Sequence, residues 1–141
     1  MFSRILFPID INHPESWEKA LPLVLQCAGA SGEVHLLGIV HDLGENVVSS
    51  FLPEDFERKA MERLKAQLTE FADANVAGKV KTEVHVGHGH VAPTVLRHAE
   101  KLGADLIVIA SHMPDGFQAL LVGSNADRVV RHAEIPVLVV R

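Results

Sequence analysis

The sequence predicts an α/β fold, in which a parallel sheet carries helices on both faces. Segments with the character of strands alternate with segments of helical period along the chain. Residues 104–110 are almost continuously apolar, as a strand covered on both sides must be. The chain has 141 residues, of which 48% are hydrophobic, enough for one sizeable core. No linker, repeat or low-complexity tract interrupts it, so we expect one domain over 1–141.

The chain opens with an apolar run over 4–10, which we interpret as a strand with Asp10 at its carboxyl end. Residues 13–32 follow with apolar side chains at helical spacing on one face. Pro14 falls in the first turn of this predicted helix, where proline is tolerated. Pro22 lies further in and is expected to kink it.

The apolar stretch 33–40 is predicted to be the second strand, and 41–52 has no clear period. From 53 to 76, apolar residues recur every three or four positions, which predicts a long amphipathic helix with a charged outer face. Its apolar stripe consists of Phe56, Ala60, Leu64, Leu68 and Phe71.

The second half continues the alternation. Residues 79–87 alternate as a strand, and 91–103 form a helix closed by Gly103. A strand over 104–110, a helix over 124–134 and a strand over 135–141 complete the chain.

Composition argues against several classes of protein. A net charge of -5 with scattered Lys and Arg does not suit a nucleic-acid binder, so any bound phosphate must be held mainly by backbone N–H groups. No apolar run approaches the roughly 20 residues of a membrane span, and the N-terminus lacks the pattern of a signal peptide. Cys27 lies in an apolar helix face, which favours a buried thiol over a nucleophile. We expect a cytoplasmic protein.

Ligands of open parallel sheets bind beyond the carboxyl ends of the strands. The predicted strands deliver to that edge Asp10, the residues after Val40, "GHGHV" at 87–91 and "SHMPDG" at 111–116. Asp10 either accepts hydrogen bonds from a base or ribose, or caps the helix that follows it.

A Gly-Ser-Asn group, 123–125, opens the last predicted helix. Its free N–H groups and the positive end of the helix dipole form an anion site without a basic side chain. The alternative is that Ser124 or Asn125 serves only as a helix cap.

Nine histidines are many for this length, and "HVGHGH" at 85–90 contains three of them. No carboxylate or cysteine completes a familiar ligand spacing, so we interpret them as turn histidines and expect no metal site. Ser111 and His112 are adjacent and cannot share a proton directly. The chain has neither a GxSxG elbow nor a P-loop, and we find no catalytic constellation.

The chain resembles the universal stress protein family over its whole length, and most closely the small bacterial F/G-type members. The resemblance lies in "ILFPID" at 5–10, "GADLIVIASH" at 103–112 and "LLVGSNADRVVRHAEIPVLVVR" at 120–141. It implies five parallel strands in the order 3-2-1-4-5 and a bound ATP or AMP, with Mg²⁺ as the accompanying ion. It also implies a homodimer, or a tetramer, formed through the last strand, Val137, Leu138, Val139 and Val140.

The ATP-binding members of that family share a phosphate-loop pattern: Gly, two residues, Gly, nine residues, then Gly-Ser or Gly-Thr. In this chain the pattern falls on Ala110, Met113, Gly123 and Ser124, so both leading glycines are replaced. Pro114, which follows Met113, has no N–H to donate. The second half of the loop is therefore better preserved than the first.

The resemblance also assigns the nucleoside half of the site. Asp10 matches the acid that contacts the base, Ile39 and Val40 match the apolar residues that flank it, and Gly89 and Val91 match the turn beside the ribose. The complete candidate set is Pro8, Ile9, Asp10, Ile39, Val40, Gly89, Val91, Ala110, Ser111, His112, Met113, Gly123, Ser124 and Asn125.

Three functions follow in order of preference. The first is a stress-response sensor or regulator that binds an adenine nucleotide. The second is a homodimeric interaction module of the same fold that works without a nucleotide. The third is a slow ATP hydrolase, although no Mg²⁺-holding pair or water-activating base is evident.

Overall fold

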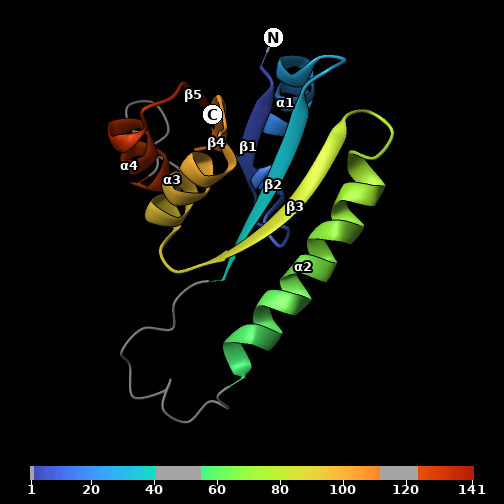
Figure 1. Cartoon of the computed structure of the whole chain (residues 1–141), viewed down its shortest axis with the longest axis vertical. Helices are drawn as coiled ribbons and strands as arrows, with labels where there is room; N and C mark the ends of the chain where they lie inside the picture. Colours follow the sequence, from blue (N-terminus) through green and yellow to red (C-terminus); the bar gives the residue numbers. More distant parts are fainter. Residues whose placement is uncertain (1, 41–54, 112–123) are drawn as a thin grey trace.

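The computed structural model describes residues 2–40, 55–111 and 124–141. In this part of the chain, five parallel strands form one sheet in the order β3-β2-β1-β4-β5 (Figure 1). The strands are β1 (Arg4–Pro8), β2 (Glu33–Val40), β3 (Lys81–His88), β4 (Leu106–Ala110) and β5 (Val137–Val140). The α/β class and the strand order predicted from the sequence are confirmed.

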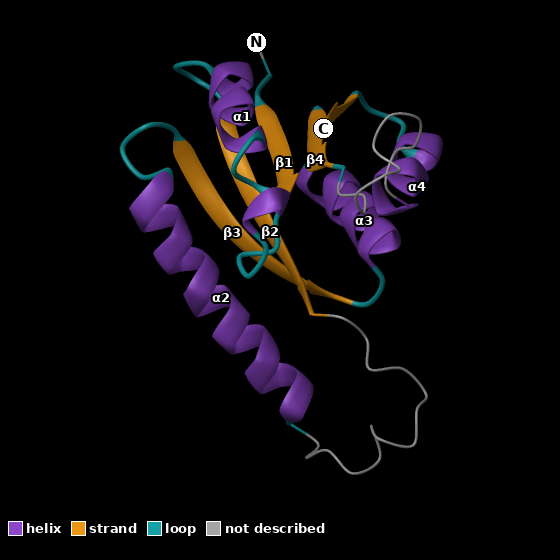
Figure 2. Ribbon diagram, turned by 180° about the vertical axis from the view of Figure 1, so that it is seen from behind, coloured by secondary structure: helices purple, strands orange, loops and turns teal. Residues whose placement is uncertain are grey.

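Helices cover both faces of the sheet, as Figure 2 shows from behind. They are α1 (Ala20–Ala28), α2 (Phe56–Asn75), α3 (Val91–Leu102) and α4 (Ser124–His132), and a short 3-10 helix, Pro14–Ser16, precedes α1. Among the described helices, none combines the length and the apolar run needed to cross a membrane.

Alternation along the strands divides the core into two layers. Ile5 and Phe7 of β1 pack with α1 and α2, and Cys27 of α1 is partly buried against the same layer. Leu6 of β1 and Leu37 of β2 pack with α3 and α4. Each central strand is therefore buried on both faces, which explains its continuous apolar sequence.

The helix predicted over 13–32 is interrupted, and the expected kink at Pro22 is wrong. The 3-10 helix gives way to a turn, and α1 begins only at Ala20. Pro22 is the third residue of α1, where no intrahelical acceptor exists for an N–H. It therefore marks the start of the regular helix, because its ring would crowd the carbonyl of Glu18 if the helix extended further back.

The predicted apolar stripe of α2 is buried at Leu68 and partly buried at Leu64 and Phe71, which pack against the core. Phe56 departs from it and is 40% exposed. It is the first residue of α2, at the end of the helix that diverges from the sheet in Figure 1. The helical period predicted for this segment is confirmed, but the sheet does not extend far enough to cover the first turn.

Candidate functional site

A cavity of about 490 Å³ lies at the carboxyl ends of β1, β2 and β4. Strand order reverses beside β1, because the chain runs outward from β1 to β2 and β3 and then crosses back to β4 on its other side. Such a switch point separates the connections and leaves a crevice for ligands. Seven of the predicted residues line this cavity: Pro8, Ile9, Asp10, Ile39, Val91, Ala110 and Asn125.

The floor and walls of the cavity are mostly aliphatic. Ile9 follows β1, and its N–H donates to the carbonyl of Leu37, 2.9 Å away, which fixes β1 against β2 at the rim. Ile39, near the end of β2, and Val91, the first residue of α3, also line the cavity. Ile109 completes the surface from β4. These side chains give the cavity an apolar surface.

Asp10 organises the polar side of the cavity. Its carboxylate accepts the N–H of Asn12 at 3.0 Å and contacts Nδ1 of His13 at 2.8 Å. The backbone N–H of Asp10 donates to Ser16 Oγ at 2.9 Å, and that hydroxyl donates to the Asp10 carbonyl at 2.8 Å. The carboxylate thus stabilises the turn, yet half of its side-chain surface stays exposed for further donors.

The turn between β3 and α3 requires glycine at position 89. Gly89 has φ +122°, which other residues rarely adopt, and its N–H donates to the carbonyl of Val40 at 3.0 Å. Neither residue lines the cavity itself. They hold the end of β2 beside the start of α3, so their contribution is to position Ile39 and Val91.

The phosphate half of the predicted site is only partly described. Ser124 and Asn125 are the first two residues of α4 as the structure describes it. Of this half, Ala110 and Asn125 line the cavity and Ser124 does not. The Ser111 N–H donates to the Val140 carbonyl at 2.8 Å. His112, Met113 and Gly123 lie outside the described residues.

Sequence reasoning missed several residues that line the cavity. They are Asn12, His13, Glu15, Ser16, Leu37 and Leu64, in addition to Ile109. The first four immediately follow Asp10 in "DINHPES", where Asp and Ser two to six residues apart are typical of side chains that bond the backbone of a turn. Leu64 belongs to the recognised apolar stripe of α2, but its distance from the sheet edge could not be predicted.

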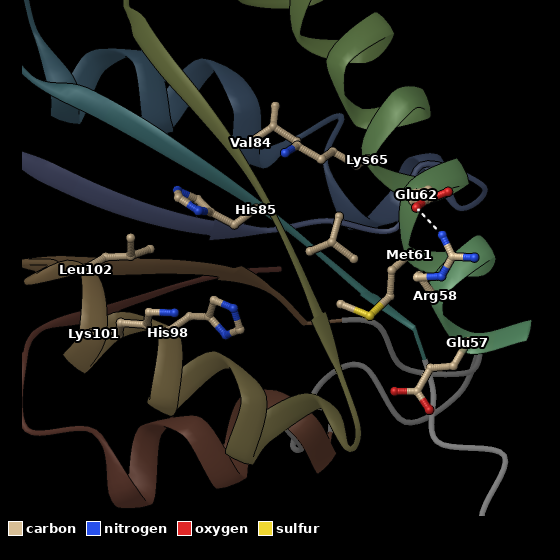
Figure 3. A pocket seen from close by; sticks show the side chains of 11 residues that line it. Glu57, Arg58, Met61, Glu62, Lys65, Val84, His85, His98, Lys101 and Leu102 are labelled. Atoms are coloured by element: carbon tan, nitrogen blue, oxygen red, sulfur yellow. Dashed lines mark hydrogen bonds and ion pairs between the residues drawn. The ribbon is translucent and has the colours of Figure 1, made fainter. Parts of the chain in front are cut away.

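A second cavity, of about 680 Å³, lies along β3 between α2 and α3 (Figure 3). Its lining is rich in long charged side chains, among them Arg58, Glu62 and Lys101, and Arg58 pairs with Glu62 at 3.1 Å. His85 lies in this wall, and burial, together with the nearby His35, lowers the pKa of its imidazole. Although this cavity is larger, the one at the switch point combines an apolar surface with converging polar groups, and we take it as the candidate site.

Comparisons with known proteins agree with the family resemblance and with the observed sheet. The family model described as "Universal stress protein family" matches residues 1–141. "Universal stress protein G" of Shigella flexneri is 33% identical over 147 residues, and the match covers 100% of each chain.

Two solved structures share the fold. The structure of hypothetical protein MJ0577 is similar with a TM-score of 0.80 and 26% identity, covering 99% of this chain and 96% of that one. A universal stress protein solved in complex with cAMP has a TM-score of 0.66 at 15% identity, covering 99% of this chain and 97% of that one. With a family match over its full length and a relative that is 33% identical from end to end, this chain belongs to the universal stress protein family.

Proposed function

We propose that this chain binds an adenine nucleotide, ATP or AMP, in the cavity at the carboxyl ends of β1, β2 and β4, and acts in the cytoplasm as a sensor or regulator of the stress response. The observation that carries the proposal is the convergence of seven residues from five separate segments on one cavity. All seven belong to the set that the sequence predicts for a nucleotide site.

The size and chemistry of the cavity suit a nucleoside. Its volume of about 490 Å³ is within the usual range of small-molecule sites, about 300–1,000 Å³. Ile9, Ile39 and Val91 supply the apolar contacts that an adenine ring buries. The Asp10 carboxylate accepts hydrogen bonds from the base or the ribose, since His13 and Asn12 occupy only part of its lone-pair capacity.

The phosphates would extend toward α4. The first amides of that helix have no partner within the helix, and Ser124 and Asn125 are exposed there. Ala110 adds a methyl group where the family pattern has glycine. This methyl group slightly reduces the space through which a phosphate could approach the backbone. ATP and AMP differ only in the number of phosphates, which would lie on the α4 side of the cavity. The ratio of their affinities therefore measures how well the altered loop holds phosphate.

A related fold supports the choice of ligand class. The universal stress protein solved with cAMP has the same topology, and cAMP is an adenine nucleotide. Mg²⁺ would accompany ATP as its usual counterion. Hydrolysis is not part of the proposal, because positioning the phosphates does not by itself activate a water molecule.

Calorimetric titration of nucleotide-free protein with ATP and with AMP, both with Mg²⁺, tests the proposal. We expect binding, and we expect Asp10→Ala and Gly123→Val to weaken it. Loss of hydrogen bonds to a charged group costs about 1.5–3 kcal/mol, or about 10- to 150-fold in Kd for Asp10→Ala. Asp73→Ala, an exposed carboxylate on α2, is the matched control.

Two results of the titration would contradict the proposal. If both site variants are folded by circular dichroism and bind like the parent, the ligand does not use this cavity. If the parent binds neither nucleotide, the second candidate function becomes the better account. That candidate is a nucleotide-independent homodimeric module, and it is favoured by one observation: β5 is an edge strand on which Val137, Leu138 and Val139 are only partly buried.

A further inference from the structure

A cluster of histidine and carboxylate side chains lies on the sheet away from the candidate nucleotide site. Strands β2 and β3 pair in parallel, with His35 opposite Glu83 and Leu37 opposite His85. Because side chains alternate between faces, Glu33, His35, Glu83 and His85 all project from the face that carries α3. None of them lines the cavity at the carboxyl ends.

Three potential ligand atoms of this cluster lie close together. Nδ1 of His35 and Nε2 of His85 are hydrogen-bonded at 2.8 Å, and Oε2 of Glu83 is 3.5 Å from the first nitrogen and 3.7 Å from the second. In the plane of these three atoms, the point equidistant from them lies about 2.0 Å from each, which is the bond length of Zn²⁺ to imidazole nitrogen or carboxylate oxygen. A cation there would replace the hydrogen bond between the two imidazoles, with a small rotation of each ring.

A carboxylate orients the ring of His35 from its other side. Its Nε2 lies 2.9 Å from Oε1 of Glu33. Glu33 pairs with Lys81 at 2.9 Å and with Arg4 at 3.1 Å, so its carboxylate is ionised and accepts a hydrogen bond from the ring of His35. Nε2 therefore carries the hydrogen, and the lone pair of Nδ1 accepts the hydrogen bond from Nε2 of His85, the bond that a cation would replace. A carboxylate behind a ligating imidazole is the usual outer partner that orients histidine on a metal.

Exposure differs across the cluster in a way that suits an ion site. The side chain of His35 is 4% exposed, that of His85 22% and that of Glu83 50%. His35 is thus a buried ligand, whereas solvent reaches His85 and Glu83. Figure 3 shows His85 on the side of β3 that faces His98 and Lys101 of α3. Lys101 is an exposed, flexible side chain that can turn into solvent when a cation arrives.

We propose that His35, Glu83 and His85 form a binding site for a divalent transition ion of the Zn²⁺ type, with Glu33 as the carboxylate behind His35. Two imidazoles and one carboxylate, without thiolate, are ligands that Zn²⁺ accepts, and water would complete a four-coordinate shell on the open side. The ion would tie β3, an edge strand, to β2. Local spacing could not reveal this site, since 48 residues separate His35 from Glu83 and only the strand register unites them.

Zinc titration of tag-free protein, stripped of metal with a chelator that is then removed, tests the site. We expect one equivalent to bind with a Kd in the micromolar range or tighter. His85→Ala and Glu83→Gln should each weaken that Kd at least tenfold. The control is His132→Ala, which removes an exposed histidine of α4 and should leave the Kd unchanged. Glu83 is half exposed, so its variant keeps the test valid even if His85→Ala does not fold.

Cobalt provides an independent readout. Co²⁺ in the site should give the visible absorption of a low-symmetry four-coordinate ion, and both ligand variants should lose it. Absence of stoichiometric Zn²⁺ binding to the parent would overturn the proposal. So would folded His85→Ala and Glu83→Gln proteins that bind Zn²⁺ as the parent does, because any binding would then come from other histidines.

Discussion

At the scale of single residues, Asp10 stabilises a turn rather than capping a helix, because the cap positions of the 3-10 helix and of α1 are His13 and Lys19. Its carboxylate holds the turn through Asn12 and His13, half of its side-chain surface is exposed, and the residue lines the cavity. Sequence could place Asp10 at the end of a strand, because an apolar run leads to it. It could not predict His13 as its partner, since that contact depends on the turn conformation rather than on residue type.

Glu33 leads to a residue-scale prediction on stability and pH. Hydrogen bonds from Lys81 and His35 lower the pKa of its carboxyl to about 2, below the value in an unfolded chain. A depressed pKa in the folded state stabilises the protein above the unfolded pKa, and this contribution is lost as pH falls toward the folded pKa. We therefore expect Glu33→Gln to lower the urea midpoint at pH 6, and the difference from the parent to shrink between about pH 5 and pH 2.

Urea unfolding in the presence of a chelator, at unit steps of pH, measures this difference without any contribution from bound metal. Glu62→Gln is the control, because its partner Arg58 is an exposed residue of the same helix and such pairs contribute little. A parent-to-variant difference for Glu33→Gln that stays constant from pH 6 to pH 2 would contradict the depressed pKa.

At the scale of elements, the packing of α2 on the sheet depends on a residue without a side chain. A Cβ placed on Gly38 of β2 would lie 2.6 Å from Leu68 Cδ1 and 3.0 Å from Leu64 Cδ2. Gly38 therefore allows α2 to approach β2 closely. Because Leu64 also lines the candidate site, this approach fixes one wall of the cavity.

We predict that Gly38→Ala destabilises the fold by about 1–3 kcal/mol, as overpacked cores do. Combining it with Leu68→Ala should cost less than the sum of the two single changes, since the shortened side chain makes room for the new methyl group. Urea unfolding of the four proteins measures the coupling, with Lys65→Ala on the exposed face of α2 as control. Additive effects would mean that Gly38 does not set the distance between helix and strand.

The order and type of the elements were predictable from sequence, whereas their ends were less so. The period of α2 and the apolar run of β4 are local properties, and both are where the sequence places them. The interrupted helix around Pro22 and the exposed Phe56 depend on how far a neighbouring element reaches. The grouping of His35 with Glu83 depends on strand register, which pattern reasoning did not address.

At the scale of the whole molecule, two edge strands border the sheet, β3 and β5. An edge strand presents unpaired backbone groups that favour pairing with another chain. β5 is short, and three of its four residues are only partly buried. The family resemblance points to this edge as the surface of a homodimer.

We predict that light scattering after size exclusion gives about twice the 15.4 kDa mass of one chain at micromolar concentration. Val139→Lys should shift the protein toward monomer by placing a charge on the pairing edge. Val130→Lys, at a residue of α4 that is 48% exposed, should remain dimeric. If the parent protein stays monomeric at 100 times higher concentration, the prediction that β5 forms a dimer surface is wrong.

The central claim is that a nucleoside occupies the cavity at the switch point of the sheet. The most direct measurement is a titration of ¹⁵N-labelled protein with AMP, followed by the amide resonances in two-dimensional NMR spectra. The account predicts saturable shifts at Ile9, Asp10, Ile39, Val91 and Ala110, with amides along β3 and the outer face of α2 unchanged. Saturable shifts confined to β3 and α2, or no shifts at millimolar AMP, would contradict it.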